Sequence, residues 1–152
     1  MKPGQATVIA ISGVALPWRY KYSGGYPPEV VRAVYPANHR VVEIDKRTLE
    51  CTGQYLEYRD KIWKARGADV ATDVFLNPSF AHVSAILYDE GCWVGQSKHH
   101  PGVDFKVVHN PNATAVLPDG WYPEGDEYWW REGDSIERRR NRRNSEQKVA
   151  SD

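Results

Sequence analysis

The chain has 152 residues, of which 41% are hydrophobic, 26% charged and 12% aromatic, and its 20 basic and 20 acidic side chains cancel. Such a length and composition are typical of one globular domain. No apolar run approaches the ~20 residues of a membrane-spanning helix, and the first residues show no secretion signal. The two cysteines, Cys51 and Cys92, provide no disulfide framework. We therefore expect a cytoplasmic protein that has no membrane partner and no cofactor.

Charge is unevenly distributed along the chain. Residues 1–118 hold 13 basic and 11 acidic side chains, so this part is nearly balanced. Residues 119–137, here called the acidic segment, hold one basic and seven acidic side chains. Residues 138–152, here called the basic segment, hold six basic and two acidic ones. An aromatic, acidic stretch is thus followed directly by an arginine-rich one. The zero net charge of the chain therefore results from oppositely charged segments that lie next to each other in the sequence.

The first part of the chain predicts a strand, a short helix and a hairpin. Residues 7–11 are β-branched or small and apolar, as in a buried strand. Pro28 suits the first turn of a helix over residues 29–34, which Pro36 ends. Residues 41–51 predict a β-hairpin with a polar turn in its middle.

Residues 55–66 are compatible with two structures. Their apolar and aromatic side chains could form one face of a helix that Gly67 would end. The same residues could form a second hairpin that turns at residues 59–60, and we favour it because it continues the first hairpin as a meander. We expect further strands over residues 74–76, 82–88 and 105–109.

The C-terminus predicts a charged helix or a tail. Asp134 can cap a helix that begins at Ser135 and runs to about Lys148, and Glu137 can complete a capping box. The stretch has almost no apolar face, so it would be a solvated helix or a tail that becomes ordered on something acidic.

These elements together predict an α+β fold. It would be a single domain with a mixed, mainly antiparallel sheet, a short helix after the first strand and a C-terminal charged helix or tail. The compact domain would span residues 1–134, and the charged C-terminal part would span residues 135–152.

Residues 81–118 contain the most distinctive block of the sequence. It has a strand over Val83–Leu87, Trp93 in a polar loop, and a second strand that ends in His109–Ala113 and leads to Leu117-Pro118. The block resembles the C-terminal part of uncharacterised bacterial proteins with a VSAVL strand and an HNP-x-A…PLP sequence. Longer members of that group carry a PD-(D/E)XK-like nuclease region before the block, and we find no such motif here. The resemblance therefore implies an accessory module or scaffold without nuclease activity.

Four residues in and after the loop could bind a metal or act as acids and bases. A transition metal needs three or four N, O or S ligands at about 2.0–2.3 Å. Adjacent histidines rarely both reach one ion, so we favour solvated side chains and expect no metal site. A small hydrolase is the enzymatic alternative, and its candidate residues are His99, His100, Asp104 and His109.

The His109–Asn112 sequence has a structural explanation. Pro111 excludes the helical region for Asn110 and ends the strand. Asparagine side chains satisfy backbone groups in such turns, and the histidine could lock the turn by a hydrogen bond. A Ser-His-Asp triad with Ser84 is not expected, because Ser84 lies in mid-strand without the sharp turn that exposes a nucleophile.

The acidic segment is the best candidate for a binding surface. Aromatic rings flanked by carboxylates repel phosphate and suit a cation, a sugar face or a basic peptide. The alternative is that the rings cover the core while the acids keep this cover in water. The candidate binding residues are Trp121, Tyr122, Tyr128, Trp129 and Trp130.

The basic segment adds five candidate binding residues, Arg138, Arg139, Arg140, Arg142 and Arg143. They could dock on the acidic segment of the same chain or of a neighbouring chain, which would favour a symmetric dimer. They could instead contact nucleic-acid phosphates, but the adjoining acids would repel the same backbone. We therefore expect a non-enzymatic binding or interaction module that self-associates, rather than an enzyme or a nucleic-acid-binding protein.

Overall fold

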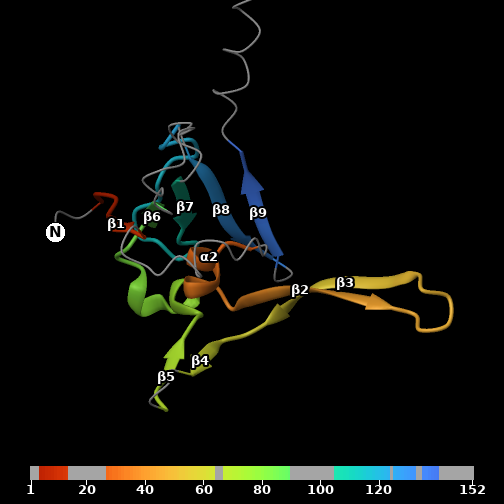
Figure 1. Cartoon of the computed structure of the whole chain (residues 1–152). Helices are drawn as coiled ribbons and strands as arrows, with labels where there is room; N and C mark the ends of the chain where they lie inside the picture. Colours follow the sequence, from red (N-terminus) through yellow and green to blue (C-terminus); the bar gives the residue numbers. More distant parts are fainter. Residues whose placement is uncertain are drawn as a thin grey trace, which may run out of the picture.

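The centre of the protein is a five-stranded mixed sheet built from β1 (Val8–Ser12), β6 (Ala85–Asp89), β7 (Phe105–His109), β8 (Asp126–Arg131) and β9 (Ser135–Arg139). The computed structural model describes residues 4–13, 27–63, 67–89, 105–123, 125–132 and 135–140 (Figure 1). The strand order is β1-β6-β7-β8-β9. The pairs β1–β6 and β7–β8 are parallel, and the pairs β6–β7 and β8–β9 are antiparallel.

Helix α2 (Glu29–Val34) covers one face of this sheet. Pro28 precedes the helix, and the chain turns extended at Tyr35 before Pro36, so the predicted helix over residues 29–34 is confirmed. The apolar side of the helix joins β6, β7 and β8 in one buried cluster, which contains Val30, Val31, Val34, Tyr35, Phe75, Val83, Ile86, Val108 and Tyr128. Removing these side chains from water is what holds the helix on the sheet.

A smaller apolar cluster of Ala85, Val107 and Leu117 lies on the opposite face of the sheet. Successive side chains of a strand alternate between the two faces, and Val108 accordingly belongs to the helix side. His109, two residues after Val107, therefore points to the same face as Val107. This face, which carries the loop that follows β7, is where the candidate site lies.

Two β-hairpins form separate two-stranded sheets. β2 (Ala37–Ile44) pairs with β3 (Cys51–Tyr58), and β4 (Lys61–Trp63) pairs with β5 (Asp69–Ala71). The predicted first hairpin is thus confirmed in a longer form. The strand interpretation of residues 55–66 holds for 55–58 and 61–63, but the predicted pairing across residues 59–60 is wrong, because β4 pairs with β5 instead of β3.

The predicted strand over residues 74–76 is wrong. These residues form the 3-10 helix η1 (Val74–Leu76), which is followed directly by a second one, η2 (Pro78–Phe80). The side chain of Asn77 accepts a hydrogen bond from the backbone N–H of Ser79 at 2.9 Å and begins the second helix. A run of three apolar residues cannot distinguish the periods of a strand and a helix. Phe75 is buried, as the apolar character of these residues indicated.

The helix predicted to begin at Ser135 is also wrong over the described residues, where the chain forms β9. Strand β9 pairs antiparallel with β8, and Ile136 lies opposite Trp130. Cross-strand partners replace the predicted capping box: Glu137 accepts a hydrogen bond from Arg131 at 2.6 Å. The sheet thus includes residues 135–139, while residues 141–152 lie outside the described part of the chain.

The described residues form a single unit dominated by a mixed sheet with few helices, which agrees with the α+β class expected from the sequence. The strand predicted over residues 105–109 is confirmed as β7, and the one predicted over 82–88 appears as β6, a few residues later. No helix within the described ranges is long and apolar enough to cross a membrane.

Tyr35 joins the helix side of the core to the end of β7. Its side chain is fully buried, and its ring contacts those of Phe75 and Trp130 at centroid distances of 6.0 and 5.3 Å. Its hydroxyl donates a hydrogen bond to the backbone carbonyl of His109. Burial raises the pKa of the Tyr35 hydroxyl, so the group stays protonated and remains a donor.

Replacing Tyr35 by Phe should therefore lower the free energy of unfolding by about 1–3 kcal/mol, because the buried carbonyl of His109 loses its donor while the ring packing stays. Urea denaturation of the full chain measures this. The matched control is Tyr55→Phe, which removes an exposed hydroxyl and should change the stability by less than about 0.5 kcal/mol. Equal losses in the two variants would contradict the assignment.

Candidate functional site

A pocket of about 300 Å³ opens where β7 and β8 end. These two strands run parallel with Val108 opposite Tyr128, so their carboxyl ends reach the same edge of the sheet. His109 ends β7, and Trp129, Trp130 and Arg131 end β8. The residues that line the pocket come from the distinctive block 81–118 and from the acidic segment. They are Ser84, His109, Asn110, Pro111, Val116, Leu117, Asp119, Trp129, Trp130 and Arg131.

Asn110 builds one wall of the pocket by closing the turn after β7. Its side-chain amide donates to the carbonyls of Phe80 at 3.0 Å and Val83 at 2.8 Å. Its side-chain oxygen accepts from the N–H of Asn112 at 2.9 Å. The turn-forming role is thus confirmed for Asn110, whereas the side chain of Asn112 donates to the carbonyl of Phe75 at 3.0 Å, outside the turn. The predicted lock by the histidine side chain is not observed, since the ring of His109 is directed to Glu127 and Trp129 instead.

Ser84 has a purely structural environment. Its buried hydroxyl donates to the carbonyl of Ala115 at 2.6 Å and accepts from the N–H of Thr7 at 2.9 Å. These two bonds attach β1 and the loop after β7 to the start of β6. A hydroxyl held in this way is not positioned as a nucleophile for His109.

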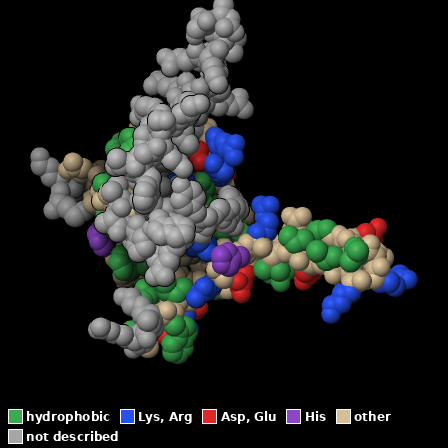
Figure 2. All heavy atoms as spheres, in the orientation of Figure 1, with side chains coloured by type: hydrophobic (Ala, Val, Ile, Leu, Met, Phe, Trp, Pro, Cys, Tyr) green, Lys and Arg blue, Asp and Glu red, His purple; other side chains and the backbone are tan. Residues whose placement is uncertain are grey.

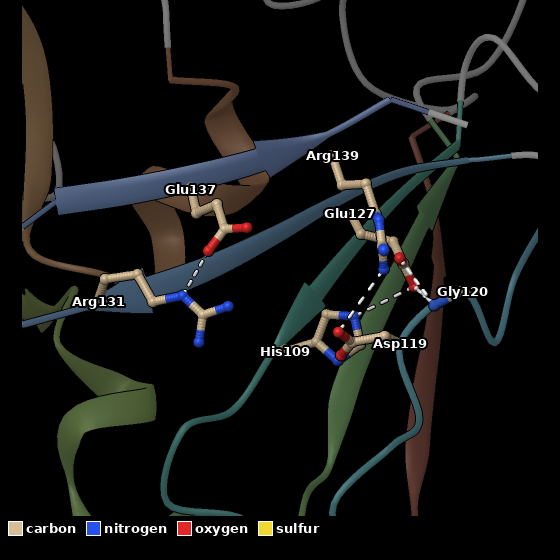
Figure 3. A network of polar contacts seen from close by, with 7 residues as sticks. All are labelled: His109, Asp119, Gly120, Glu127, Arg131, Glu137 and Arg139. Carbon is tan, nitrogen blue, oxygen red and sulfur yellow. Dashed lines mark hydrogen bonds and ion pairs between the residues drawn. The ribbon is translucent and has the colours of Figure 1, made fainter. Parts of the chain in front are cut away.

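The floor of the site contains a buried carboxylate, that of Glu127, which is 2% exposed. The backbone N–H of Gly120 lies 2.9 Å from each of its two oxygens, and Nε2 of His109 lies 3.4 Å from Oε1 (Figure 3). Gly120 has a φ of 71°, a left-handed conformation that glycine adopts without strain. The turn at Gly120 therefore directs its N–H into the sheet, where the carboxylate needs a donor.

His109 is held between this carboxylate and an aromatic ring. Its imidazole stacks on Trp129 at a centroid distance of 4.6 Å and an interplanar angle of 12°. Burial lowers the pKa of His109, and the nearby charge of Glu127 opposes this effect without overcoming it. The imidazole is therefore neutral near pH 7, and the pocket presents a polar but uncharged ring beside an indole.

Arginines of β8 and β9 pair with the acids around the pocket. Arg139 lies 3.6 Å from Asp119, and Figure 3 shows this pair beside His109 and Glu127. Arg131, which pairs with Glu137, also lies over the ring of Trp129 at 5.7 Å. These pairs are largely exposed, so each contributes less than about 1 kcal/mol to stability. Their effect is to place one acid and one cation at the rim of the pocket.

The expected docking of the basic segment on the acidic segment occurs within one chain for its first two arginines. Besides the Arg139–Asp119 pair, Nε of Arg138 donates to Asp126 at 3.0 Å. Arg138 also lies 6.0 Å from the centre of the Tyr128 ring. Arg140 is exposed at the end of β9, and Arg142 and Arg143 lie outside the described residues.

The predicted aromatic residues divide between the pocket and the core. Trp129 and Trp130 line the pocket. Tyr128 is buried on the helix side, so for this residue the core-covering interpretation is correct. Tyr122 packs against the second cluster and contacts the ring of Phe105 at 5.2 Å, and Trp121 is exposed beside it.

Of the proposed acid–base residues, only His109 lies in the described part of the chain; His99, His100 and Asp104 lie outside it. Three residues of the site were not predicted, namely Glu127, Asp119 and Arg131. The period-two alternation of β8 could have identified two of them, since Glu127 and Arg131 share the face of Trp129. Within the described ranges, no three side chains of the metal-binding types converge on one point.

Comparison of the chain with family models, with curated proteins and with solved structures yields no match. The resemblance to uncharacterised bacterial proteins stays a prediction.

The pKa of His109 makes the stability of the protein depend on pH. Because this pKa is lower in the folded than in the unfolded chain, the unfolded chain binds a proton first as the pH falls below about 6.5. Glu127, Asp119 and Arg131 are the charged groups that face the ring. We expect the free energy of unfolding to fall between pH 7 and pH 5, by at most about 1.4 kcal/mol per pH unit from this group.

Chemical denaturation at several pH values gives the free energy of unfolding as a function of pH. Between pH 7 and pH 5 this free energy should change less steeply with pH for His109→Gln than for the wild type, whatever the absolute stability of the variant. His82→Gln removes an exposed histidine and should keep the wild-type slope. An unchanged slope in His109→Gln would disprove this origin of the pH dependence.

Proposed function

We propose that the chain is a non-enzymatic binding module that holds a small, flat, polar molecule in the pocket at the ends of β7 and β8. The observation that carries the proposal is the stacked pair of His109 and Trp129 beside a pocket that both sequence blocks line. In open sheets, ligands commonly bind outside the carboxyl ends of parallel strands, because the loops that follow the strands form a crevice there. Strands β7 and β8 provide this arrangement.

The lining indicates the chemistry of the ligand. A volume of about 300 Å³ is at the lower end of small-molecule sites, so the ligand is small. Trp129 offers an indole, and His109 offers a neutral ring, which together suit a planar heteroaromatic group. Asp119 and Arg131 lie at the rim already paired with Arg139 and Glu137, so a simple ion would have to displace a partner, and a polar uncharged molecule is favoured.

Binding is favoured over hydrolysis because the groups next to His109 are engaged in structural contacts. Ser84 has two backbone partners, and Nε2 of His109 faces a carboxylate rather than a nucleophile. The hydrolase that would use His99, His100, Asp104 and His109 remains the alternative. Metal analysis of the purified full chain tests it, since a stoichiometric bound transition metal would favour the hydrolase over the binding module.

Nucleic-acid binding is the less favoured alternative. Arg138 and Arg139 are paired with Asp126 and Asp119, so a phosphate backbone would have to displace acids that already neutralise them. A salt titration of DNA or RNA binding decides this point. Nucleic-acid binding through the arginines requires an affinity for DNA or RNA that falls steeply as the salt concentration rises. The small-molecule binding module requires no affinity for nucleic acid.

The pocket predicts selective binding of planar heteroaromatic compounds. In titrations of the full chain with adenine and nicotinamide as probes and benzoate as a carbocyclic control, followed by NMR, we expect the indole N–H signals of Trp129 and Trp130 to shift for adenine or nicotinamide with a Kd of about 1 mM or tighter, and to shift less for benzoate. Trp129→Leu should weaken that binding about tenfold or more, because it removes the ring that lines the pocket and holds the imidazole of His109 in place.

The matched control is Trp121→Leu, which changes an exposed tryptophan that does not line the pocket. This variant should bind the probe with wild-type affinity. Equal affinity in both variants, or no shift with any probe, would contradict the proposed site.

A further inference from the structure

Within the described part of the chain, the parallel ladder between β7 and β8 stops before the two strands end. Its last pair is Val108 and Tyr128, whereas β7 continues to His109 and β8 to Arg131. With this register, the next backbone hydrogen bond of a parallel ladder would join the N–H of Trp130 to the carbonyl of His109. The strands therefore separate at two residues that line the pocket.

The carbonyl of His109 is directed toward β8, where the missing bond would form. The backbone N–H of the next residue, Asn110, donates to the carbonyl of Ser84 at 2.9 Å, on the β6 side. Successive residues of a strand direct their backbone groups to opposite neighbours, so those of His109 point to β8. The acceptor is thus in place, and something other than its orientation keeps the ladder from continuing.

The hydroxyl of Tyr35 occupies the place of the missing bond. It donates to the carbonyl of His109, and the backbone N–H of Trp130 donates to its oxygen. Tyr35 directly follows α2 and is fully buried, and its ring packs on that of Trp130 at a centroid distance of 5.3 Å. One hydroxyl from the helix side of the core therefore satisfies both groups that a direct backbone hydrogen bond would have used.

A hydroxyl between two backbone groups keeps them farther apart than a direct bond does. A direct N–H···O bond holds nitrogen and oxygen about 2.9 Å apart, whereas two bonds through a hydroxyl oxygen hold them roughly 4.5–5 Å apart. The extra width of about 2 Å separates His109 from Trp130 at the edge of the sheet where the pocket opens.

We propose that Tyr35 is a positioning residue for the pocket, and that its hydroxyl holds the ends of β7 and β8 at the separation that admits a flat ligand. This role rests on the proposed binding function. The described lining of the pocket does not include Tyr35, so the residue acts through the backbone of His109 and Trp130. Walls that are fixed before the ligand arrives lower the entropic cost of binding.

Amide hydrogen exchange followed by NMR tests the shared hydroxyl without any ligand. In the wild type, the Trp130 amide should exchange within about tenfold of the Tyr128 amide, which belongs to the ladder. In Tyr35→Phe, the rate of Trp130 relative to that of Tyr128 should rise about tenfold or more, because the amide loses its acceptor. A uniform loss of stability cancels in this ratio. Fast exchange of Trp130 in the wild type, or an unchanged ratio in the variant, would overturn the proposal.

The affinity for adenine and nicotinamide tests the positioning role itself. Both probes are titrated into the full chain, under conditions in which each variant gives the dispersed NMR spectrum of a folded protein. Tyr35→Phe should weaken the tighter-binding probe about fivefold or more, because the two strand ends lose the group that fixes their separation.

Two variants serve as controls and should change the Kd by less than about twofold. Val30→Ala leaves a cavity in the same buried cluster, so it lowers stability without touching the hydroxyl. Tyr55→Phe removes a half-exposed hydroxyl from the hairpin β2–β3, which projects from the rest of the protein (Figure 2).

The outcomes separate this role from the proposed function. A wild type that binds neither probe contradicts the proposed function, and the positioning role falls with it. A wild type that binds, together with equal affinity of Tyr35→Phe, overturns the positioning role alone. An equal loss of affinity in Val30→Ala also overturns it, because affinity would then follow stability rather than the hydroxyl.

Discussion

The buried carboxylate of Glu127 is the constraint on which the candidate site depends. A carboxylate removed from water must find donors, because an unpaired buried charge costs several kcal/mol. Here the donor comes from outside β8: the N–H of Gly120, while Nε2 of His109 lies 3.4 Å from one carboxylate oxygen. The turn at residues 119–120 must therefore stay over the strands. This requirement keeps Asp119 at the rim of the pocket and His109 beside Trp129.

His109 is fixed from both faces of the sheet. From the helix side, Tyr35 donates to its backbone carbonyl, and from the other side Glu127 and Trp129 hold its ring. The core that α2 buries and the pocket that the loop encloses therefore share one residue. A change in core packing at Tyr35 would reach the pocket through the backbone of β7, without any direct contact between Tyr35 and a ligand.

The parts of the fold that sequence could predict are those with local signals. The prolines around α2, the apolar run of β7 and the His-Asn-Pro-Asn turn each act through neighbouring residues, and each appears where expected. Strands β8 and β9 could not be predicted in this way, since their evidence is cross-strand pairing. Glu137 illustrates the difficulty: its spacing from Asp134 suggested a capping box, whereas its partner is Arg131 on the adjacent strand. The pocket depends on the same pairing and was only partly predictable.

The placement of the arginines also decides which surface is available for self-association. A dimer formed by exchange of the basic segment would have to replace the contacts of Arg138 and Arg139 with acids of their own chain. Tethered groups compete at an effective concentration of about millimolar, so a partner chain at lower concentration gains nothing by exchange. The contacts of Arg138 and Arg139 therefore tie β9 to acids of its own chain.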